Sequence, residues 1–129
     1  MSRPKAASLI RQRLSSEIGR IHKQAPFCIA LCYPSPYRAA MSSLGFLQIY
    51  KVIQNEAGMA CERAFLPDDL NEPQRPMTYE SQKPLDAFPV IAFSVAYELE
   101  LAGVIQMLEA AKLPALRQER HKRHPVVIA

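Results

Sequence analysis

Two cysteines in an apolar segment are the first residues whose spacing suggests chemistry. Cys28 and Cys32 are separated by three residues, as in the first half of a CxxxCxxC motif, whose thiolates ligate an iron–sulfur cluster. The position of the third ligand holds Ser35, however, and residues four apart lie on the same face of a strand. We therefore interpret both cysteines as small hydrophobic residues of a buried strand. Cys61 lies far along the chain and adds no metal-ligand spacing.

Histidine offers little support for acid–base or nucleophilic catalysis. His121 and His124 lie among three basic residues at positions 120, 122 and 123, where positive charge disfavours a bound metal cation. No histidine follows a segment that we expect to be a strand, so neither a histidine base nor a nucleophilic triad is indicated.

The loop after the first apolar segment is the next candidate. Ser42, Ser43 and Gly45 could present backbone N–H groups to a phosphate at a helix N-terminus. Prolines and bulky side chains separate them from the end of the strand, so the pattern is only weakly that of a flavin phosphate loop. A phosphoacceptor domain would need carboxylates where the chain has Tyr33 and Pro34.

The strands that must position these residues are indicated by short apolar runs bounded by proline and polar residues. Such runs are typical of parallel strands that are buried on both faces. They predict strands at residues 27–33, 59–66, 89–95 and 125–129.

Two helices are expected between these strands. The first begins near Ser43, with Ser42 or Ser43 as its N-cap, and stops at Gly58. The second covers residues 98–112. Its expected buried face carries Leu101, Ile105 and Leu108, with Val104 beside them.

The alternation of strands and helices predicts an α/β fold with a mainly parallel, doubly wound, flavodoxin-like sheet. Because the last expected strand has no covering helix after it, we expect residues 26–129 to be an incomplete domain, truncated at that strand. Ligands of such sheets bind outside the carboxyl ends of the strands, in a small-molecule pocket or at a domain interface. The residues expected there are Tyr33, Pro34, Tyr37, Met41, Ser42, Ser43, Gly45, Ser94, Tyr97 and Glu98. Tyr33 and Tyr97 could equally cap the edge of the core.

Residues 1–25 are expected to contribute an extra, basic amphipathic helix over residues 4–23. This helix must pack on the rest of the domain, on a second copy of the chain, or on another part of a larger protein. Most of its basic residues lie off the apolar stripe. The stripe consists of Ile10, Leu14, Ile18 and Ile21.

Composition places the chain among globular proteins. At 129 residues, with 49% hydrophobic and 22% charged residues, it fits one domain with a sizeable core. No apolar run approaches the roughly 20 residues needed to cross a membrane, and no signal peptide is recognisable. The three cysteines lack disulfide-rich spacing. We therefore expect a soluble, cytoplasmic protein without a membrane partner.

The net charge of +4 is concentrated at the two ends of the chain. Residues 1–24 carry a net charge of +5 and residues 117–129 carry +3, whereas the segment between them carries −4. Basic segments can attract nucleic acid through counterion release. They can equally be solvated surface, so nucleic-acid binding remains an alternative.

Two longer stretches resemble a known family. "YPSPYRAAMSSLGFLQIYKVI", residues 33–53, and "AFPVIAFSVAYELELAGVIQML", residues 87–108, resemble the N-terminal region of bacterial radical S-adenosylmethionine (radical SAM) proteins. In that family a tyrosine-proline elbow leads to a Met-Ser-x-Leu-Gly turn, and a Phe-Ser-x-x-Tyr-Glu-Leu segment follows a later strand. The final "HPVVIA" is similar to the family's strand before a Gly-Gly-Pro turn. The resemblance covers about residues 26–129.

The resemblance implies a flavodoxin-like domain, similar to cobalamin-binding domains, placed before the barrel that carries the CxxxCxxC motif. It implies that the [4Fe–4S] cluster and S-adenosylmethionine bind in that barrel, because this chain lacks the motif. Cobalamin is a candidate ligand of this domain. The Asp-x-His-x-x-Gly motif, whose histidine ligates cobalt, is absent from the chain.

The leading hypothesis is a non-catalytic accessory domain that rests against the barrel and helps to enclose its substrate or corrinoid site. By itself the chain is not expected to be an enzyme. One alternative is a true cobalamin-binding module, and another is a basic RNA- or ribosome-associated module. Self-association through the N-terminal helix also stays open.

Overall fold

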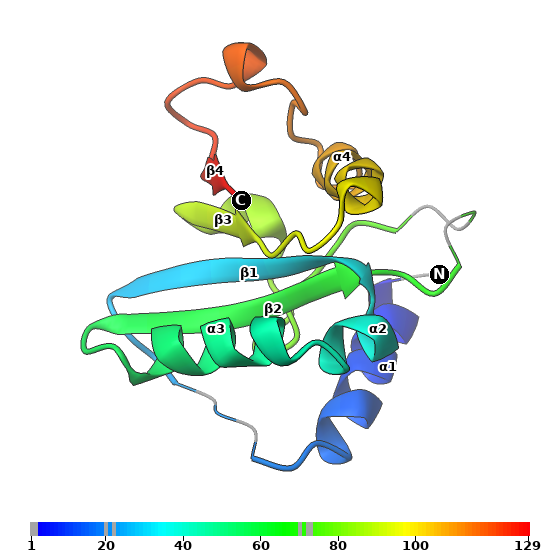
Figure 1. Cartoon of the computed structure of the whole chain (residues 1–129), viewed down its shortest axis with the longest axis vertical. Coiled ribbons are helices and arrows are strands. Elements are labelled where there is room, and N and C mark those ends of the chain that lie inside the picture. The colour runs from blue at the N-terminus through cyan, green and yellow to red at the C-terminus, as the bar shows by residue number, and fades with distance from the viewer. Residues whose placement is uncertain (1–2, 20, 22, 70, 72–73) are drawn as a thin grey trace.

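The computed structural model describes residues 3–19, 21, 23–69, 71 and 74–129. The helices are α1 (Arg3–Ser15), α2 (Tyr37–Met41), α3 (Leu44–Asn55) and α4 (Leu101–Ala110) (Figure 1). The strands are β1 (Phe27–Pro36), β2 (Met59–Leu66), β3 (Val90–Phe93) and β4 (Val126–Ile128), and short 3-10 turns form η1 (Leu85–Ala87), η2 (Glu98–Glu100) and η3 (Arg117–Glu119). Within the described ranges, no helix combines the length and the apolar composition needed to cross a membrane.

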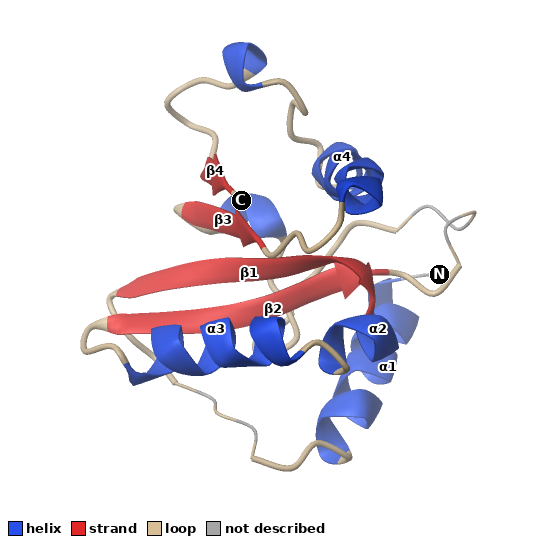
Figure 2. Ribbon diagram, in the orientation of Figure 1, coloured by secondary structure: helices blue, strands red, loops and turns tan. Residues whose placement is uncertain are grey.

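The described strands form one parallel sheet in the order β2-β1-β3-β4. The core on one face involves α1 and α3, and the core on the other face involves α4 (Figure 2). This arrangement confirms the predicted α/β, flavodoxin-like fold with an additional N-terminal helix. It brings the carboxyl ends of β1 and β3 side by side, so the segments that follow these two strands share one edge of the sheet.

β1 is the central strand and extends further than the sequence predicted. Its residues 29–34 are all buried, as expected for a strand covered on both faces. The register shifts after Tyr33, and Pro36 then pairs with Leu66 of β2. The proline-rich elbow is therefore part of the strand and not a free loop.

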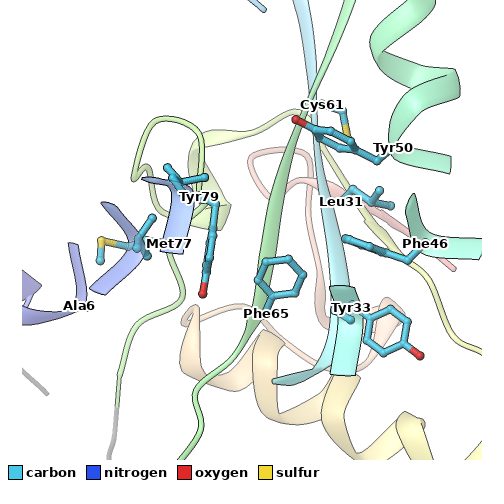
Figure 3. Packing of buried hydrophobic residues seen from close by; sticks show 12 residues of the cluster. Ala6, Leu31, Tyr33, Phe46, Tyr50, Cys61, Phe65, Met77 and Tyr79 are labelled. Carbon is cyan, nitrogen blue, oxygen red and sulfur yellow. The ribbon is translucent and has the colours of Figure 1, made fainter. Parts of the chain in front are cut away.

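Aromatic side chains fill the core between the sheet and the two helices α1 and α3 (Figure 3). The ring of Phe46 on α3 meets Tyr33 and Phe65 edge-on, at centroid distances of 5.5 and 5.6 Å. Phe65 in turn meets Tyr79, in the β2–β3 connection, at 4.8 Å. Edge-to-face pairs of this kind are favourable beyond the area that they bury. The cluster fixes α3 and the β2–β3 connection against the carboxyl ends of β1 and β2.

The buried face of α4 differs from the predicted one. The structure buries Gly103, Met107 and Leu108, whereas Leu101 and Ile105 are 54% and 47% exposed. A Cβ atom on Gly103 would lie only 2.4 Å from the carbonyl oxygen of Pro34. The helix thus approaches β1 through its glycine, and this close contact turns the predicted leucine and isoleucine toward solvent.

α1 is shorter than predicted and packs on this domain. Ile10 and Leu14 are buried in the α1/α3 core, but the helix ends at Ser15 and the side chain of Ile18 is fully exposed. Gly19 follows with a φ of 75°, a conformation that interrupts a right-handed helix. The predicted helix over residues 4–23 was therefore wrong beyond Ser15. Two of its predicted positions, residues 20 and 22, lie outside the described part of the chain.

Candidate functional site

The structure places the sequence-predicted site residues along the carboxyl ends of β1 and β3 and in the turns that follow. We call this edge, residues 33–45 and 94–101, the carboxyl-end rim. It includes all ten predicted positions, but the structure divides them between two sides. One side faces α1 and the β2–β3 connection, and the other faces η2 and α4.

On the α1 side, Tyr37 and Met41 contact neighbouring parts of the chain. The Tyr37 hydroxyl donates to the Glu17 carboxylate at 2.6 Å, and its ring stacks on Tyr79 at 5.1 Å. The guanidinium of Arg13 lies 4.9 Å from the centre of the Tyr37 ring. The sulfur of Met41 lies 3.6 Å from a guanidinium nitrogen of Arg63. These two predicted ligand contacts thus stabilise the fold.

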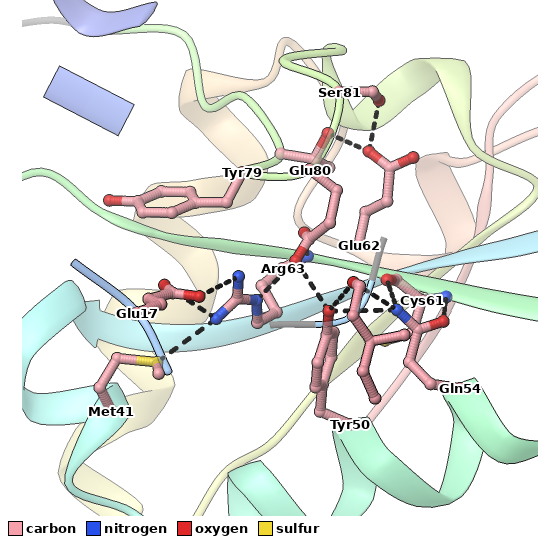
Figure 4. Close-up of polar contacts among 12 residues, drawn as sticks. Glu17, Met41, Tyr50, Gln54, Cys61, Glu62, Arg63, Tyr79, Glu80 and Ser81 are labelled. Carbon is pink, nitrogen blue, oxygen red and sulfur yellow. Dashed lines mark hydrogen bonds and ion pairs between the residues drawn. The ribbon is translucent and has the colours of Figure 1, made fainter. Parts of the chain in front are cut away.

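The group that organises this side is Arg63, which the sequence analysis did not single out. Its side chain is buried on β2 between two carboxylates (Figure 4). The guanidinium donates to Glu80 at 2.7 Å and to Glu17 at 2.9 and 3.1 Å. The central carbon of the guanidinium, Cζ, also lies 4.8 Å from the centre of the Tyr50 ring. One buried cation therefore ties the turn after α1 and the β2–β3 connection to the sheet.

The same network closes the outer edge of β2. Gln54 of α3 accepts a hydrogen bond from the backbone N–H of Cys61 and donates one to its carbonyl, both at 3.0 Å. Two residues further on, the Arg63 N–H donates to the Glu80 carboxylate and the Arg63 carbonyl accepts from the Tyr79 N–H, both at 2.7 Å. Side chains and one backbone amide thus replace a neighbouring strand along this edge.

Burial and charge set the ionisation of this network. Burial raises the pKa of the Glu80 carboxyl, and the nearby Arg63 guanidinium opposes that rise. For Arg63, burial alone would lower the pKa, but the Glu80 and Glu17 carboxylates raise it above its usual range. Burial and the Glu80 carboxylate also raise the pKa of Tyr50. Arg63 therefore stays cationic, and its interaction with the carboxylates is that of a buried, hydrogen-bonded ion pair.

On the other side of the rim, Glu100 organises the turn after β3. Tyr33 is buried, and burial together with the Glu100 carboxylate raises the pKa of its hydroxyl. One oxygen of Glu100 accepts from the backbone N–H groups of Ala96 and Tyr97 at 2.7 and 2.9 Å, and the other lies 3.5 Å from the Ser35 hydroxyl. The sequence analysis named Glu98, which is exposed, instead of Glu100.

Only half of a capping pattern marks Glu100 in the sequence, because Tyr97 is not a usual N-cap residue. Glu100 stands three residues after Tyr97, which is the spacing at which an N3 glutamate bonds the backbone of a helix N-cap residue. For α3 the sequence predicted a cap at Ser42 or Ser43, and it is the Ser43 hydroxyl that accepts from the Phe46 N–H, at 3.3 Å. The two turns that face each other across the rim are thus each held by a cap.

The remaining predicted positions have different surroundings. Pro34 is buried beneath Gly103, and the backbone N–H of Ser94 donates to the Cys32 carbonyl. Ser42 is exposed, with its hydroxyl donating to the Arg38 carbonyl, and Gly45 is exposed in the first turn of α3. They form no phosphate cradle.

The rim also presents large apolar side chains to solvent. Leu44 is 82% exposed, Tyr97 71%, Leu99 92% and Leu101 54%. We call these four residues the apolar rim surface. Leu44 follows the cap residue Ser43, and the other three lie in or beside η2, which Glu100 holds close to Tyr33. Exposed apolar side chains grouped at one edge are typical of an interaction surface.

An open groove lies beside the elbow on the α1 side. Its volume is about 560 Å³, and polar side chains of α1 form much of its wall. Arg13 lines both this groove and a smaller cavity near Phe65. Its guanidinium donates to the Tyr79 hydroxyl at 2.6 Å and to the Asp68 carboxylate at 2.7 Å. Arg38 also lines the groove and is exposed. The groove therefore has polar and apolar surface in similar amounts, unlike the apolar rim surface.

The cysteines behave as core residues. Cys32 is buried on the α4 face of the sheet and Cys61 is buried on the α1/α3 face, while Cys28 is half-buried. Burial raises the pKa of the Cys28 thiol to about 11, with the Glu62 carboxylate adding to the rise. A thiol with this pKa is almost entirely protonated at neutral pH, and thiolate is the form that binds metals. Among the residues that the structure describes, no three His, Cys, Asp or Glu side chains are grouped to hold a metal ion.

The rim does not fit a corrinoid held by a protein histidine. Across the described ranges the rim contains no histidine, and His121 and His124 lie in the segment before the amino end of β4. In addition, Phe46 packs against Tyr33 and fills the space beneath the end of β1. The residues present therefore supply no axial ligand to cobalt at this edge.

Comparisons with known proteins gave one finding. The family model described as "Radical SAM proteins, N-terminal" matches residues 45–129, about two thirds of the chain. The matched region starts in the first turn of α3 and includes the turn that carries Tyr97 and Glu100. Neither the curated proteins nor the solved structures gave a match.

Replacing Arg63 by methionine should strongly destabilise the fold, because Glu17 and Glu80 would be left buried without their cation. We expect a loss of about 3–5 kcal/mol in the free energy of unfolding. Arg75→Met is the matched control, since Arg75 forms an ion pair of similar length, 2.8 Å, with Asp86 at the surface. That change should alter the free energy by less than about 1 kcal/mol. Urea unfolding of both variants measures the difference, and equal losses would contradict a central role for Arg63.

Proposed function

This chain belongs to the family of N-terminal regions of radical SAM proteins, and we propose that it is a non-catalytic accessory domain that packs against the catalytic barrel of such a protein. In this proposal the carboxyl-end rim faces the barrel and helps to enclose its active site. The observation that carries the proposal is the apolar rim surface. It lies at the edge where ligands and partner domains of parallel sheets are usually found.

The energetics favour a partner for this surface. Burying a leucine side chain contributes about 1.5–3 kcal/mol, so covering Leu44, Leu99 and Leu101 would stabilise docking substantially. The backbone beneath these side chains is already held by the caps at Ser43 and Glu100. Docking would therefore need little ordering of the chain, which keeps its entropic cost low.

The chemistry of the radical reaction is assigned to the barrel. The [4Fe–4S] cluster and S-adenosylmethionine would bind there, since cluster ligation needs thiolates and the cysteines of this chain are core residues. The contribution of this domain would be to shape the active site and to exclude water from it. We also propose that the protein is cytoplasmic. Its free thiols, and the iron–sulfur cluster proposed for the barrel, suit a reducing compartment.

A cobalamin-binding module remains the alternative within the same fold, but no rim residue favours it. We propose that the isolated chain does not retain a corrinoid. The test is to mix it with hydroxocobalamin, remove unbound ligand by desalting and record the visible spectrum. Colourless protein is expected, because the rim offers no imidazole to coordinate cobalt. Coloured protein with a shifted spectrum would overturn this part of the proposal.

The RNA-binding alternative loses support from the placement of the charges. The basic residues of α1 and those of residues 117–123 lie at opposite ends of the molecule (Figure 1). They do not combine into one basic surface, which a module that tracks a nucleic-acid backbone would need.

The docking proposal predicts that polar substitutions on the apolar rim surface impair the intact radical SAM protein without unfolding this domain. Leu99 is exposed in the isolated chain, so Leu99→Asp should change the free energy of unfolding of the chain alone by less than about 0.5 kcal/mol. In the intact protein it should weaken docking by tenfold or more, in line with the loss of about 1.5–3 kcal/mol from one leucine contact. Limited proteolysis between the domains and the rate of S-adenosylmethionine cleavage measure this effect.

Leu116→Asp is the control for this experiment. Leu116 is also an exposed leucine, 53% accessible, but it lies in the α4–β4 connection and not on the rim. It should leave both proteolysis and cleavage unchanged. If Leu99→Asp behaves like Leu116→Asp in the intact protein, the rim is not the docking surface.

A further inference from the structure

The α1/α3 face of the sheet is covered over β1 and β2, only partly covered over β3, and most exposed over β4. Pairing places Val126 and Ile128 of β4 beside Val90 and Ala92 of β3, on the face opposite to Val127, which packs against the α4 core. Val126 is 61% exposed and Ile128 is 50% exposed. Parallel strands are normally buried on both faces, so this apolar half of the sheet lacks its usual cover.

α3 packs over β2, and the side of this helix that faces away from the outer edge of β2 carries further exposed apolar residues. Tyr50 and Gln54 of α3 turn toward the outer edge of β2, where they bond Glu80 and Cys61. At about 100° per residue, Ile49 and Val52 lie on the other flank of the helix. They are 42% and 58% exposed. We call Ile49, Val52, Val90, Ala92, Val126 and Ile128 the uncovered face.

We infer that an amphipathic α-helix, supplied by the part of the radical SAM protein outside residues 1–129, packs on the uncovered face. The inference rests on the proposed function, in which such a polypeptide is present. It concerns a different surface from the rim and names a different partner element. The uncovered face is continuous with the existing core, because Ala92 already packs against the aromatic cluster of α1 and α3.

The dimensions of the uncovered face suit one helix. Neighbouring strands lie about 4.8 Å apart, so two strands span roughly the 10 Å diameter of a helix with its side chains. A strand added at the edge of β4 would extend the sheet but leave the face itself exposed. A helix laid beside α3 would bury the exposed side chains of β4 and the flank of α3 together.

The charges at the two ends of the face suit a helix that runs against the strand direction. The carboxyl edge carries Glu98 and Glu100 after β3, and the amino edge carries Lys122 and Arg123 shortly before β4. A helix macrodipole is positive at its N-terminus and negative at its C-terminus. The complementary orientation places the helix N-terminus at the carboxyl edge and its C-terminus near the basic residues.

Site-specific photo-cross-linking in the intact radical SAM protein tests this inference. The photoreactive amino acid p-benzoylphenylalanine would replace Ile128 on the uncovered face, and Gln106, exposed on α4, would be the control position. We expect Ile128 to cross-link within the same polypeptide to apolar positions spaced three and four residues apart in a segment outside residues 1–129. Position 106 should not reach that segment.

Three outcomes would overturn the inference: a product of doubled mass, which indicates a second copy; a cross-link confined to residues 1–129; or no cross-link at Ile128. The same preparation is assayed for its iron–sulfur cluster. If the cluster is present and the cross-link fails, the covering helix is wrong while the proposed function stands. If the cluster is absent, the proposed function fails. An intramolecular cross-link to a helical segment would still support a helix packed on the uncovered face.

Discussion

The buried guanidinium of Arg63 is the group on which the rest of this domain depends. β2 is an outer strand of the sheet, and its backbone groups at Cys61 and Arg63 would otherwise be open to pairing with another chain. The Glu80 carboxylate bonds both the backbone and the side chain of Arg63, so one side chain closes the edge and neutralises the cation. Glu17 supplies the second carboxylate and thereby fixes the chain that leaves α1.

This arrangement determines which part of the rim is available for function. Because Glu17 also accepts from Tyr37, the start of α2 is drawn toward α1 and the Tyr37 ring packs against the core. The opposite side of the rim is held by Glu100 and remains open, with apolar side chains at the surface. An accessory domain that docks through that side would use a rigid surface, and the buried ion pairs on the α1 side would keep it rigid.

Apolar periodicity was sufficient to predict the strands and the α/β class, and the serines before α3 predicted a cap at Ser42 or Ser43, because these features depend on local pattern. The buried role of Arg63 could not be predicted, since a charged residue in a strand usually indicates a solvent-facing position and its two partners lie far away in sequence. The predicted face of α4 was right at Leu108, which is buried, and wrong at Leu101 and Ile105, because the close contact of Gly103 with Pro34 decides the packing. The predicted site residues lie on one edge as expected. Which of them pack into the fold and which stay open depends on the contacts of Glu17, Glu80 and Glu100.

Hydrogen exchange of backbone amides tests the docking of this domain most directly. It would compare residues 97–101 and the first turn of α3 in the isolated chain and in the intact radical SAM protein. Slower exchange at these amides in the intact protein, with unchanged exchange in the exposed segment 117–123, is the result expected if the rim faces the barrel. Equal exchange of the rim amides in both proteins would contradict it.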